Sequence, residues 1–269
     1  MGGSQLMTRF REIRRRWLLQ MGLQISRRTN LDKLRYLLAA LRPRVISPSL
    51  VRVGPNSDGG YLLPNDLEGI AACFSPGVSD QCGFDLEIAE RGVIVYQADA
   101  SIEQSPVFHR NFRFFRKFIG PTGGGNFLTL SQWVSFNHEF LGDLLLQMDI
   151  EGSEWAVLLS TPDEVLRKFR IMVVEFHDVH MLFHSHMFDF MTSVFSKLLQ
   201  HFHVAHIHPN NTSKVFSCEE LIIPSVLEFT FIRKDRVVSM SDLPLNFPHF
   251  QDKPCDSNKP DLELPLCWR

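Results

Sequence analysis

Short apolar runs and helix-like stretches alternate through the middle of the chain. The apolar runs cover residues 70–74, 93–98, 144–148 and 170–176. Runs of this length are typical of parallel strands that are covered on both faces. Residues 80–91, between the first two runs, space their apolar side chains as an amphipathic helix does. This alternation predicts an α/β protein.

Further elements are predicted on either side of these strands. Residues 50–62 indicate two extended segments joined by a turn, because Asp-Gly between β-forming residues favours a hairpin. Asp58 is therefore either a turn residue or part of a ligand-contacting loop. The remaining predictions are a strand over 112–119, a flexible spacer over 121–126, helices over 129–136 and 186–199, a strand over 202–207 and a closing pair of strands in ELIIP and VLEFTFIRK.

The amino-terminal segment has a different pattern. Residues 5–28 place apolar side chains on one stripe of a helix with arginines around it, and the stripe consists of Phe10, Ile13, Trp17 and Met21. A second helix is predicted over 31–41. We therefore divide the chain into a cap of basic amphipathic helices, a central domain and an extended or partly disordered tail, at residues 1–45, 46–235 and 236–269.

The basic helix has two interpretations. The first thirty residues carry seven arginines and one acid, a net charge of +6 that leaves −8 for the rest of the chain. Such a helix can lie on an anionic membrane surface. It can also dock on its own domain or fray as a terminus, which is the interpretation we prefer. Peripheral membrane contact through residues 5–28 stays the alternative.

Composition excludes several classes of protein. The chain has 269 residues, 44% of them hydrophobic, which suits one large domain with a substantial core. Its net charge of −2 gives no nucleic-acid signal. Five cysteines without a CxxC pair favour a reducing compartment, and neither an 18-residue apolar run nor the apolar core of a signal peptide occurs. We expect a cytoplasmic protein that does not bind nucleic acid.

Carboxylates gather where the apolar run 144–148 ends. The segment DLLLQMDIEGSEW, residues 143–155, places Asp149, Glu151 and Glu154 directly after the predicted strand. Ligands in open α/β sheets bind beyond the carboxyl ends of the strands, so these acids lie where chemistry is usually done. The alternative is that Asp149 or Ser153 only caps the following helix.

The next predicted strand ends in the same way. RIMVVEF, residues 170–176, carries Glu175 near its end, and His177 follows directly. A carboxylate and an imidazole are the side chains that most often move protons in active sites. The two strand ends together predict a reaction centre at this edge of the sheet.

A glycine turn precedes the helix predicted over 80–91. Its sequence SPGVSDQCGFD contains Gly77 and Gly83, and glycine lets the backbone approach a ligand closely. Asp99 follows the next strand, 22 residues after Gly77, where nucleotide-binding βαβ units hold a carboxylate for ribose hydroxyls. The turn is not GxGxxG, so Asp99 also fits a turn or cap residue.

These motifs together resemble the FkbM family of S-adenosylmethionine-dependent methyltransferases. The resemblance covers about residues 50–232, in DGGYLL, FSPGVSDQCGFDLEIAERG, DIEGSEW, VEFH, HPNN and LEFTF. Gln147 departs from the K-x-D-x-E-G of many members. The family implies a Rossmann-like sheet of seven strands, mostly parallel with one antiparallel strand near the C-terminal end, and helices on both faces.

The resemblance also implies an activity and a site. The activity is transfer of a methyl group from S-adenosyl-L-methionine to a hydroxyl, on a small-molecule or glycan acceptor such as a sugar or other secondary metabolite. We assign proton removal and acceptor orientation to Asp149, Glu175 and His177, and no residue to a metal. The expected cofactor-binding residues are Gly77, Ser79, Asp80, Asp99 and Asp149, and those expected to contact the acceptor or support these groups are Asp58, Glu151, Glu154 and Asn210.

Two other classes of function stay open. Eight of the eleven histidines fall between His177 and His208, with His180 and His184 four residues apart, which suggests a metal-dependent enzyme. No HExxH motif accompanies them. The other class is a non-catalytic relative whose basic helix and aromatic-rich surface serve docking. Donor turnover separates that class from a methyltransferase.

Overall fold

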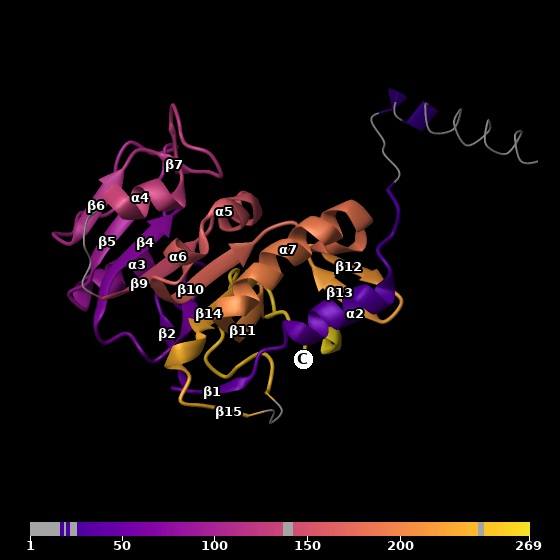
Figure 1. Ribbon diagram of the computed structural model, residues 1–269. Helices are drawn as coiled ribbons and strands as arrows, with labels where there is room; N and C mark the ends of the chain where they lie inside the picture. Colours follow the sequence, from indigo (N-terminus) through magenta and orange to yellow (C-terminus); the bar gives the residue numbers. More distant parts are fainter. Residues whose placement is uncertain (1–16, 19, 22–25, 137–141, 242–244) are drawn as a thin grey trace, which may run out of the picture.

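Seven strands form the central sheet of the computed structural model (Figure 1). Strand β14 runs antiparallel to both of its neighbours, and the other neighbouring pairs are parallel. The predicted α/β sheet with one antiparallel strand near the C-terminal end is confirmed. Across the sheet the strands are β11 (Phe202–Pro209), β14 (Leu227–Arg233), β10 (Phe169–Phe176), β9 (Asp143–Met148), β4 (Ile70–Pro76), β5 (Ile94–Ala98) and β6 (Phe112–Phe115).

The structure describes residues 17–18, 20–21, 26–136, 142–241 and 245–269. The predicted basic helix over residues 5–28 therefore lies mostly outside the described residues. Within the described part of the chain, no helix combines the length and the apolar character needed to cross a membrane.

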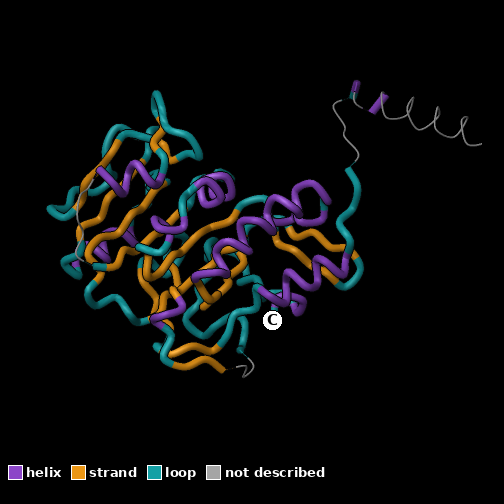
Figure 2. The backbone as a smooth tube through the Cα atoms, in the orientation of Figure 1, coloured by secondary structure: helices purple, strands orange, loops and turns teal. Residues whose placement is uncertain are grey.

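Alternation along each strand divides the core between the two faces of the sheet. In β9, Leu144 and Leu146 point to one face and Leu145 points to the other, and all three are buried. The first face is covered by helices that follow one another along it (Figures 1 and 2), namely α4 (Leu130–Phe136), α5 (Glu154–Ser160) and α7 (Ser185–His201), together with α2 (Leu31–Ala40). Burial on both faces explains why the strands are nearly continuous apolar runs.

Helix α7 shows how the sequence pattern produces this packing. Its buried residues Phe188, Met191, Phe195 and Leu198 recur every three or four positions and form one apolar face. That face lies against the sheet, where Phe195 contacts Phe229 with ring centroids 5.4 Å apart. Each such buried aromatic stabilises the fold by about 1.5–3 kcal/mol relative to an exposed one.

The second face is covered by one helix and a hairpin. Helix α3 (Gly83–Glu90) and the antiparallel pair β2 (Leu50–Val53) and β3 (Tyr61–Pro64) bury Phe84, Val53 and Tyr61 against it. The predicted pairing of the 50–62 segment is confirmed, and seven residues, 54–60, connect the two strands. Other short elements of the described chain are β1 (Val45–Ser47) paired with β15 (Ser239–Ser241), α6 (Asp163–Leu166), η1 (Val179–Phe183), η2 (Lys234–Arg236) and η3 (Leu266–Trp268).

Two of the predicted strands are arranged differently. The run 112–119 divides, because pairing of β6 with β5 ends at Phe115 and the chain then forms β7 (Phe118–Ile119), which pairs with β8 (Phe127–Leu128). The predicted closing hairpin is also wrong. ELIIP forms β13 (Leu221–Pro224), which pairs with β12 (Val215–Cys218). Both edges of β14 are occupied by β10 and β11, so β13 has no free edge there.

The described part of the carboxyl-terminal tail is packed on the domain. Leu264 and Trp268 are fully buried, and the Trp268 Nε1–H donates to the carbonyl of Ile222 at 3.0 Å. His206 and Asp252 form a buried pair at 2.8 Å between β11 and the tail. Residues 245–269 therefore form the extended wrap that was one of the two predictions for the tail.

Candidate active site

The carboxyl ends of β4, β5 and β9 meet at one edge of the sheet and border a cavity of about 420 Å³. This volume lies within the range of small-molecule sites. The cavity is lined by Gly77, Ser79, Ala98, Asp99, Ser101, Phe118, Ile119, Phe127, Asp149, Ile150, Glu151 and Ser153. Topology thus brings the glycine turn, the Asp99 loop and the acidic segment to one place, as expected for parallel strands.

Gly77 allows the first and third of these loops to touch. Its φ is +88°, and a Cβ built there would lie 1.5 Å from the backbone oxygen of Asp149. The Gly77 N–H donates to the carbonyl of Ala98 at 3.0 Å, and the Asp149 N–H donates to the carbonyl of Pro76 at 3.3 Å. The glycine is thus required by close contact between two strand ends, a role that sequence reasoning had given to ligand approach.

Asp99 is the centre of a second set of contacts. Its side chain is buried, and its Oδ2 accepts from the Ser79 N–H at 2.9 Å. Its Oδ1 accepts from the Ser101 N–H at 2.7 Å and from the Ser101 hydroxyl at 2.6 Å. A carboxylate has about four acceptor sites, so Asp99 can still accept from a ligand hydroxyl in the cavity.

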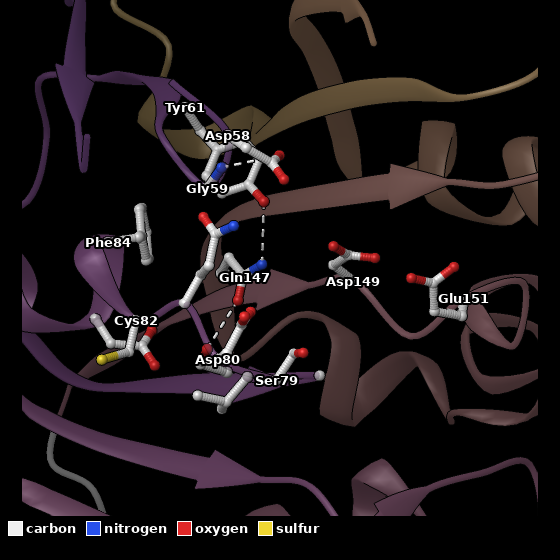
Figure 3. Close-up of a pocket in the computed structure, with 15 residues that line it drawn as sticks. Asp58, Gly59, Tyr61, Ser79, Asp80, Cys82, Phe84, Gln147, Asp149 and Glu151 are labelled. Atoms are coloured by element: carbon white, nitrogen blue, oxygen red, sulfur yellow. Dashed lines mark hydrogen bonds between the residues drawn. The ribbon is translucent and has the colours of Figure 1, made fainter. Parts of the chain in front are cut away.

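Asp149, Glu151 and His177 form a compact cluster. His177 Nε2 lies 3.3 Å from Glu151 Oε2 and 3.9 Å from Asp149 Oδ1. Glu151 is exposed and has a φ of 54°. This left-handed conformation is uncommon for residues other than glycine. Figure 3 shows Asp149 and Glu151 side by side, with Ser79 on the neighbouring segment.

Glu154 holds this cluster through hydrogen bonds. It is completely buried at the start of α5, and its Oε1 accepts from the backbone N–H groups of Ile150 at 2.9 Å and Gly152 at 3.1 Å. The same oxygen lies 3.2 Å from His177 Nδ1. Glu154 therefore orients both the loop and the imidazole ring.

Burial and neighbouring charges shift the pKa values of the cluster. Burial raises the pKa of Asp149 to about 7, although the nearby His177 opposes the shift. Burial lowers the pKa of His177, but the contact with Glu154 and the other carboxylates outweigh burial and raise this pKa to about 9. His177 is therefore mostly protonated at neutral pH. Asp149 is the better-matched proton acceptor, because a general base works best with a pKa near the operating pH.

Glu175 lies deeper than the cluster. It is buried, its Oε1 accepts from Asn210 Nδ2 at 3.0 Å, and it is the cross-strand neighbour of Glu228 on β14. Burial, followed by the charges of Asp149 and Glu228, raises the pKa of Glu175 well above its usual value. Asn210 is placed against Glu175 as a polar support, at the end of β11.

A second, smaller cavity of about 160 Å³ shares Gly77, Ser79, Asp149 and Glu151 with the first, and Figure 3 shows the residues that line it. Asp58 and Asp80 lie on its wall, together with Tyr61, Ser75 and Gln147. The Ser75 hydroxyl donates to Gln147 Oε1 at 2.7 Å, and Gln147 Nε2 donates to the Tyr61 hydroxyl at 3.4 Å. Burial raises the pKa of Asp58. Asp58 and Asp80 are thus placed beside Asp149 rather than in the larger cavity.

The aromatic wall of the larger cavity was missed by sequence reasoning. Phe118 and Phe127, which stand on β7 and β8 with ring centroids 5.5 Å apart, line it and remain partly exposed. We had treated 112–119 as one strand and 121–126 as a spacer. The signal in the sequence was the pair of phenylalanines flanking the glycine-rich PTGGGN turn.

The histidine-rich region does not gather into one site. His180 stacks on Phe216 with ring centroids 4.0 Å apart, and the Nδ1 of His184 contacts the Ser26 hydroxyl. His201 pairs with Asp163 at 3.1 Å. Among the described residues, Asp149, Glu151 and His177 are the group whose donor atoms could jointly hold a metal ion. Of the histidines that suggested a metal-dependent enzyme, only His177 belongs to this group.

The seven-stranded, mostly parallel sheet with helices on both faces is consistent with the Rossmann-like methyltransferase fold. Residues 134–202 match the family model described as the Methyltransferase FkbM domain, which confirms the predicted resemblance. The matched segment reaches from within α4 to the first residue of β11 and includes Asp149 and His177. Gly77 and Asp99 lie outside it.

One similar protein is the sesamin methylene transferase of Sinomonas sp. (strain No.22), which is 33% identical over 82 residues. The match covers 26% of this chain and 18% of that relative's length.

Proposed function

We propose that the protein transfers a methyl group from S-adenosyl-L-methionine to a hydroxyl oxygen of a small-molecule or glycan acceptor. The observation that carries this proposal is one shared cavity of about 420 Å³. Its wall contains Gly77 and Asp99, which suit a nucleoside, and also Asp149 and Glu151, which suit an acceptor hydroxyl. Bound S-adenosyl-L-methionine would supply an electrophilic methyl group on a positively charged sulfur.

The residues of the cavity fit this cofactor in three respects. Asp99 is positioned to accept from ribose hydroxyls, as carboxylates after the second strand do in nucleotide-binding folds. Phe118 and Phe127 offer aromatic surface against which an adenine can stack. Glu151 supplies negative charge on the wall of the cavity, which would favour a cationic sulfonium cofactor.

Asp149 and Glu151 line the part of the cavity that we assign to the acceptor, here called the acceptor side, and this part supplies the group that removes the acceptor proton. A neutral hydroxyl is a poor nucleophile, and a positioned base contributes about 10²–10⁴ in rate. Asp149 suits the role of this base. Protonated His177 lies beside Asp149, and Glu154 orients the His177 ring through its contact with Nδ1. Alignment of the two reacting groups can lower the barrier by about 7 kcal/mol or more.

The direct test uses isotopically labelled S-adenosyl-L-methionine with the purified protein and fractionated cell extract. Labelled product that carries the methyl group on oxygen supports the proposal. Donor binding without any turnover would instead support the non-catalytic docking relative. A product methylated on nitrogen or carbon would contradict the hydroxyl acceptor.

Asp99→Ala is expected to weaken donor binding about 10- to 150-fold, because a charged hydrogen bond contributes about 1.5–3 kcal/mol. Isothermal titration calorimetry with S-adenosyl-L-methionine measures it. Asp163→Ala is the control and should leave donor affinity unchanged, since Asp163 pairs with His201 and does not line the cavity. Unchanged affinity in Asp99→Ala would remove this residue from the cofactor site.

Asp149→Asn is expected to lower turnover by about 10² or more with little change in donor affinity, because it keeps the shape and removes the charge. His177→Ala should act similarly, because the imidazole contacts the cluster. His184→Ala is the control and should lose less than a few-fold, since His184 contacts Ser26 instead. Single-turnover rates with the identified acceptor decide it, and a wild-type rate in Asp149→Asn would remove Asp149 from the reaction.

A further inference from the structure

We propose that Asp149, Glu151 and His177 bind one divalent metal cation at the acceptor side of the cavity. The three side chains come from the ends of two adjacent parallel strands, β9 and β10. Their donor atoms, two carboxylate oxygens and one imidazole nitrogen, all lie within 4.8 Å of one another. This pattern differs from the sequence prediction, which assigned no residue to a metal.

The distances suit coordination. A cation that binds its ligands at about 2.1 Å holds neighbouring ligand atoms about 3 Å apart and opposite ones about 4.2 Å apart. His177 Nε2 is 3.3 Å from Glu151 Oε2 and 3.9 Å from Asp149 Oδ1. Small side-chain rotations therefore bring all three atoms onto one ion.

The supporting contacts are those of a metal-binding histidine. Such a histidine commonly presents its second ring nitrogen to a carboxylate, which sets the tautomer and the ring orientation. Glu154 Oε1 holds His177 Nδ1 in this way at 3.2 Å, so that Nε2 faces Asp149 and Glu151. Glu154 is itself fully buried, which restricts the orientations open to its side chain.

Two carboxylate oxygens of the site have no hydrogen-bond partner. Asp149 Oδ1 is buried without a hydrogen-bond partner, and so is Oε2 of the fully buried Glu154. In the part of the chain that the structure describes, no lysine or arginine forms an ion pair with Asp149, Glu151, Glu154 or Glu175. Buried carboxylates are costly unless they are paired or coordinate a metal, so a divalent cation would balance this cluster.

Mixed oxygen and nitrogen ligands suit several divalent ions, and Mn²⁺ accepts both. Three protein ligands leave coordination positions open for a substrate oxygen, as in catalytic metal sites. With the ion bound, His177 Nε2 would give up its proton and Asp149 would act as a ligand instead of as the base. The ion would then ease release of the acceptor proton to water, and the electron pair of the broken O–H bond would stay on the acceptor oxygen. This role rests on the proposed function, whereas cation binding does not.

The experiment titrates Mn²⁺ into the full chain and follows the loss of the free-ion signal by electron paramagnetic resonance. We expect one bound Mn²⁺ per chain and a nitrogen hyperfine coupling from His177. Glu151→Gln should weaken binding about tenfold or more, and it concerns a side chain that is 87% exposed, so folding is preserved. His177→Gln should abolish the nitrogen coupling.

Asp178→Asn is the matched control. Asp178 follows His177 directly but contacts His180, at 3.9 Å, and its positive φ of 55° tolerates asparagine. The Mn²⁺ affinity of Asp178→Asn should stay within about twofold of the wild-type value. A wild-type protein that binds no Mn²⁺, or Glu151→Gln with unchanged affinity, overturns the site. Donor binding, measured separately by calorimetry, shows whether the proposed function fails independently of the metal.

Discussion

Gly77→Ala should lower the free energy of unfolding by about 2–5 kcal/mol and remove measurable donor binding. The left-handed conformation at φ +88° costs a residue with a side chain about 1–2 kcal/mol. The new Cβ would lie 1.5 Å from the Asp149 backbone oxygen, and overpacking adds about 1–3 kcal/mol. The loops can relieve the clash only by separating, which displaces Asp149 from the cavity.

Gly92→Ala separates backbone strain from this clash. Gly92 has a similar φ of +90°, but a Cβ there meets nothing within 4 Å. It should therefore lose only about 1–2 kcal/mol and retain donor binding. Urea unfolding and calorimetry on both variants measure the difference. Equal stability losses in the two variants would show that contact between the strand ends is not decisive.

His208→Ala should destabilise the fold by about 3–5 kcal/mol, because it leaves buried carboxylates without their partner. His208 on β11 is buried between two acids, with Nδ1 3.1 Å from Glu228 Oε2 and Nε2 3.0 Å from Asp261 Oδ1. Asp261 belongs to the tail, so this histidine also joins the tail to the sheet. The control is His203→Ala on the same strand, because among the described residues His203 forms no ion pair with a carboxylate. This variant should change the free energy of unfolding by about 0.5 kcal/mol or less.

The pH dependence of this effect has a definite sign. Burial lowers the pKa of His208, but the Glu228 charge and the hydrogen bonds to Asp261 and Glu228 outweigh it and raise the pKa to about 11. A group whose pKa is raised on folding stabilises fully below its unfolded pKa of about 6.5 and loses this contribution as pH rises towards the folded value. The stability difference between wild type and His208→Ala should therefore be larger at pH 7 than at pH 9.5. Urea unfolding at both values checks it, and a difference that grows with pH would contradict a protonated His208.

The sequence by itself determined the strands of the sheet and the edge at which the candidate site lies. Apolar runs such as 144–148 and 170–176 are local patterns, and both became strands buried on two faces. The carboxyl ends of parallel strands share one edge, so Asp149 and His177 could be placed together from order alone. The DIEGSEW and VEFH motifs also led correctly to the FkbM resemblance.

Which side chains touch was decided only by the tertiary structure. Glu154 contacts His177, which is 23 residues away in the sequence, and His208 pairs with Asp261, which is 53 residues away. Strand β14 lies between β10 and β11 and does not pair with β13. Gly77 is needed because the backbone of Asp149 approaches it. Local periodicity specifies which face of a strand is apolar, but contacts between distant segments depend on strand order, register and the space left by packing, which exist only in the folded chain.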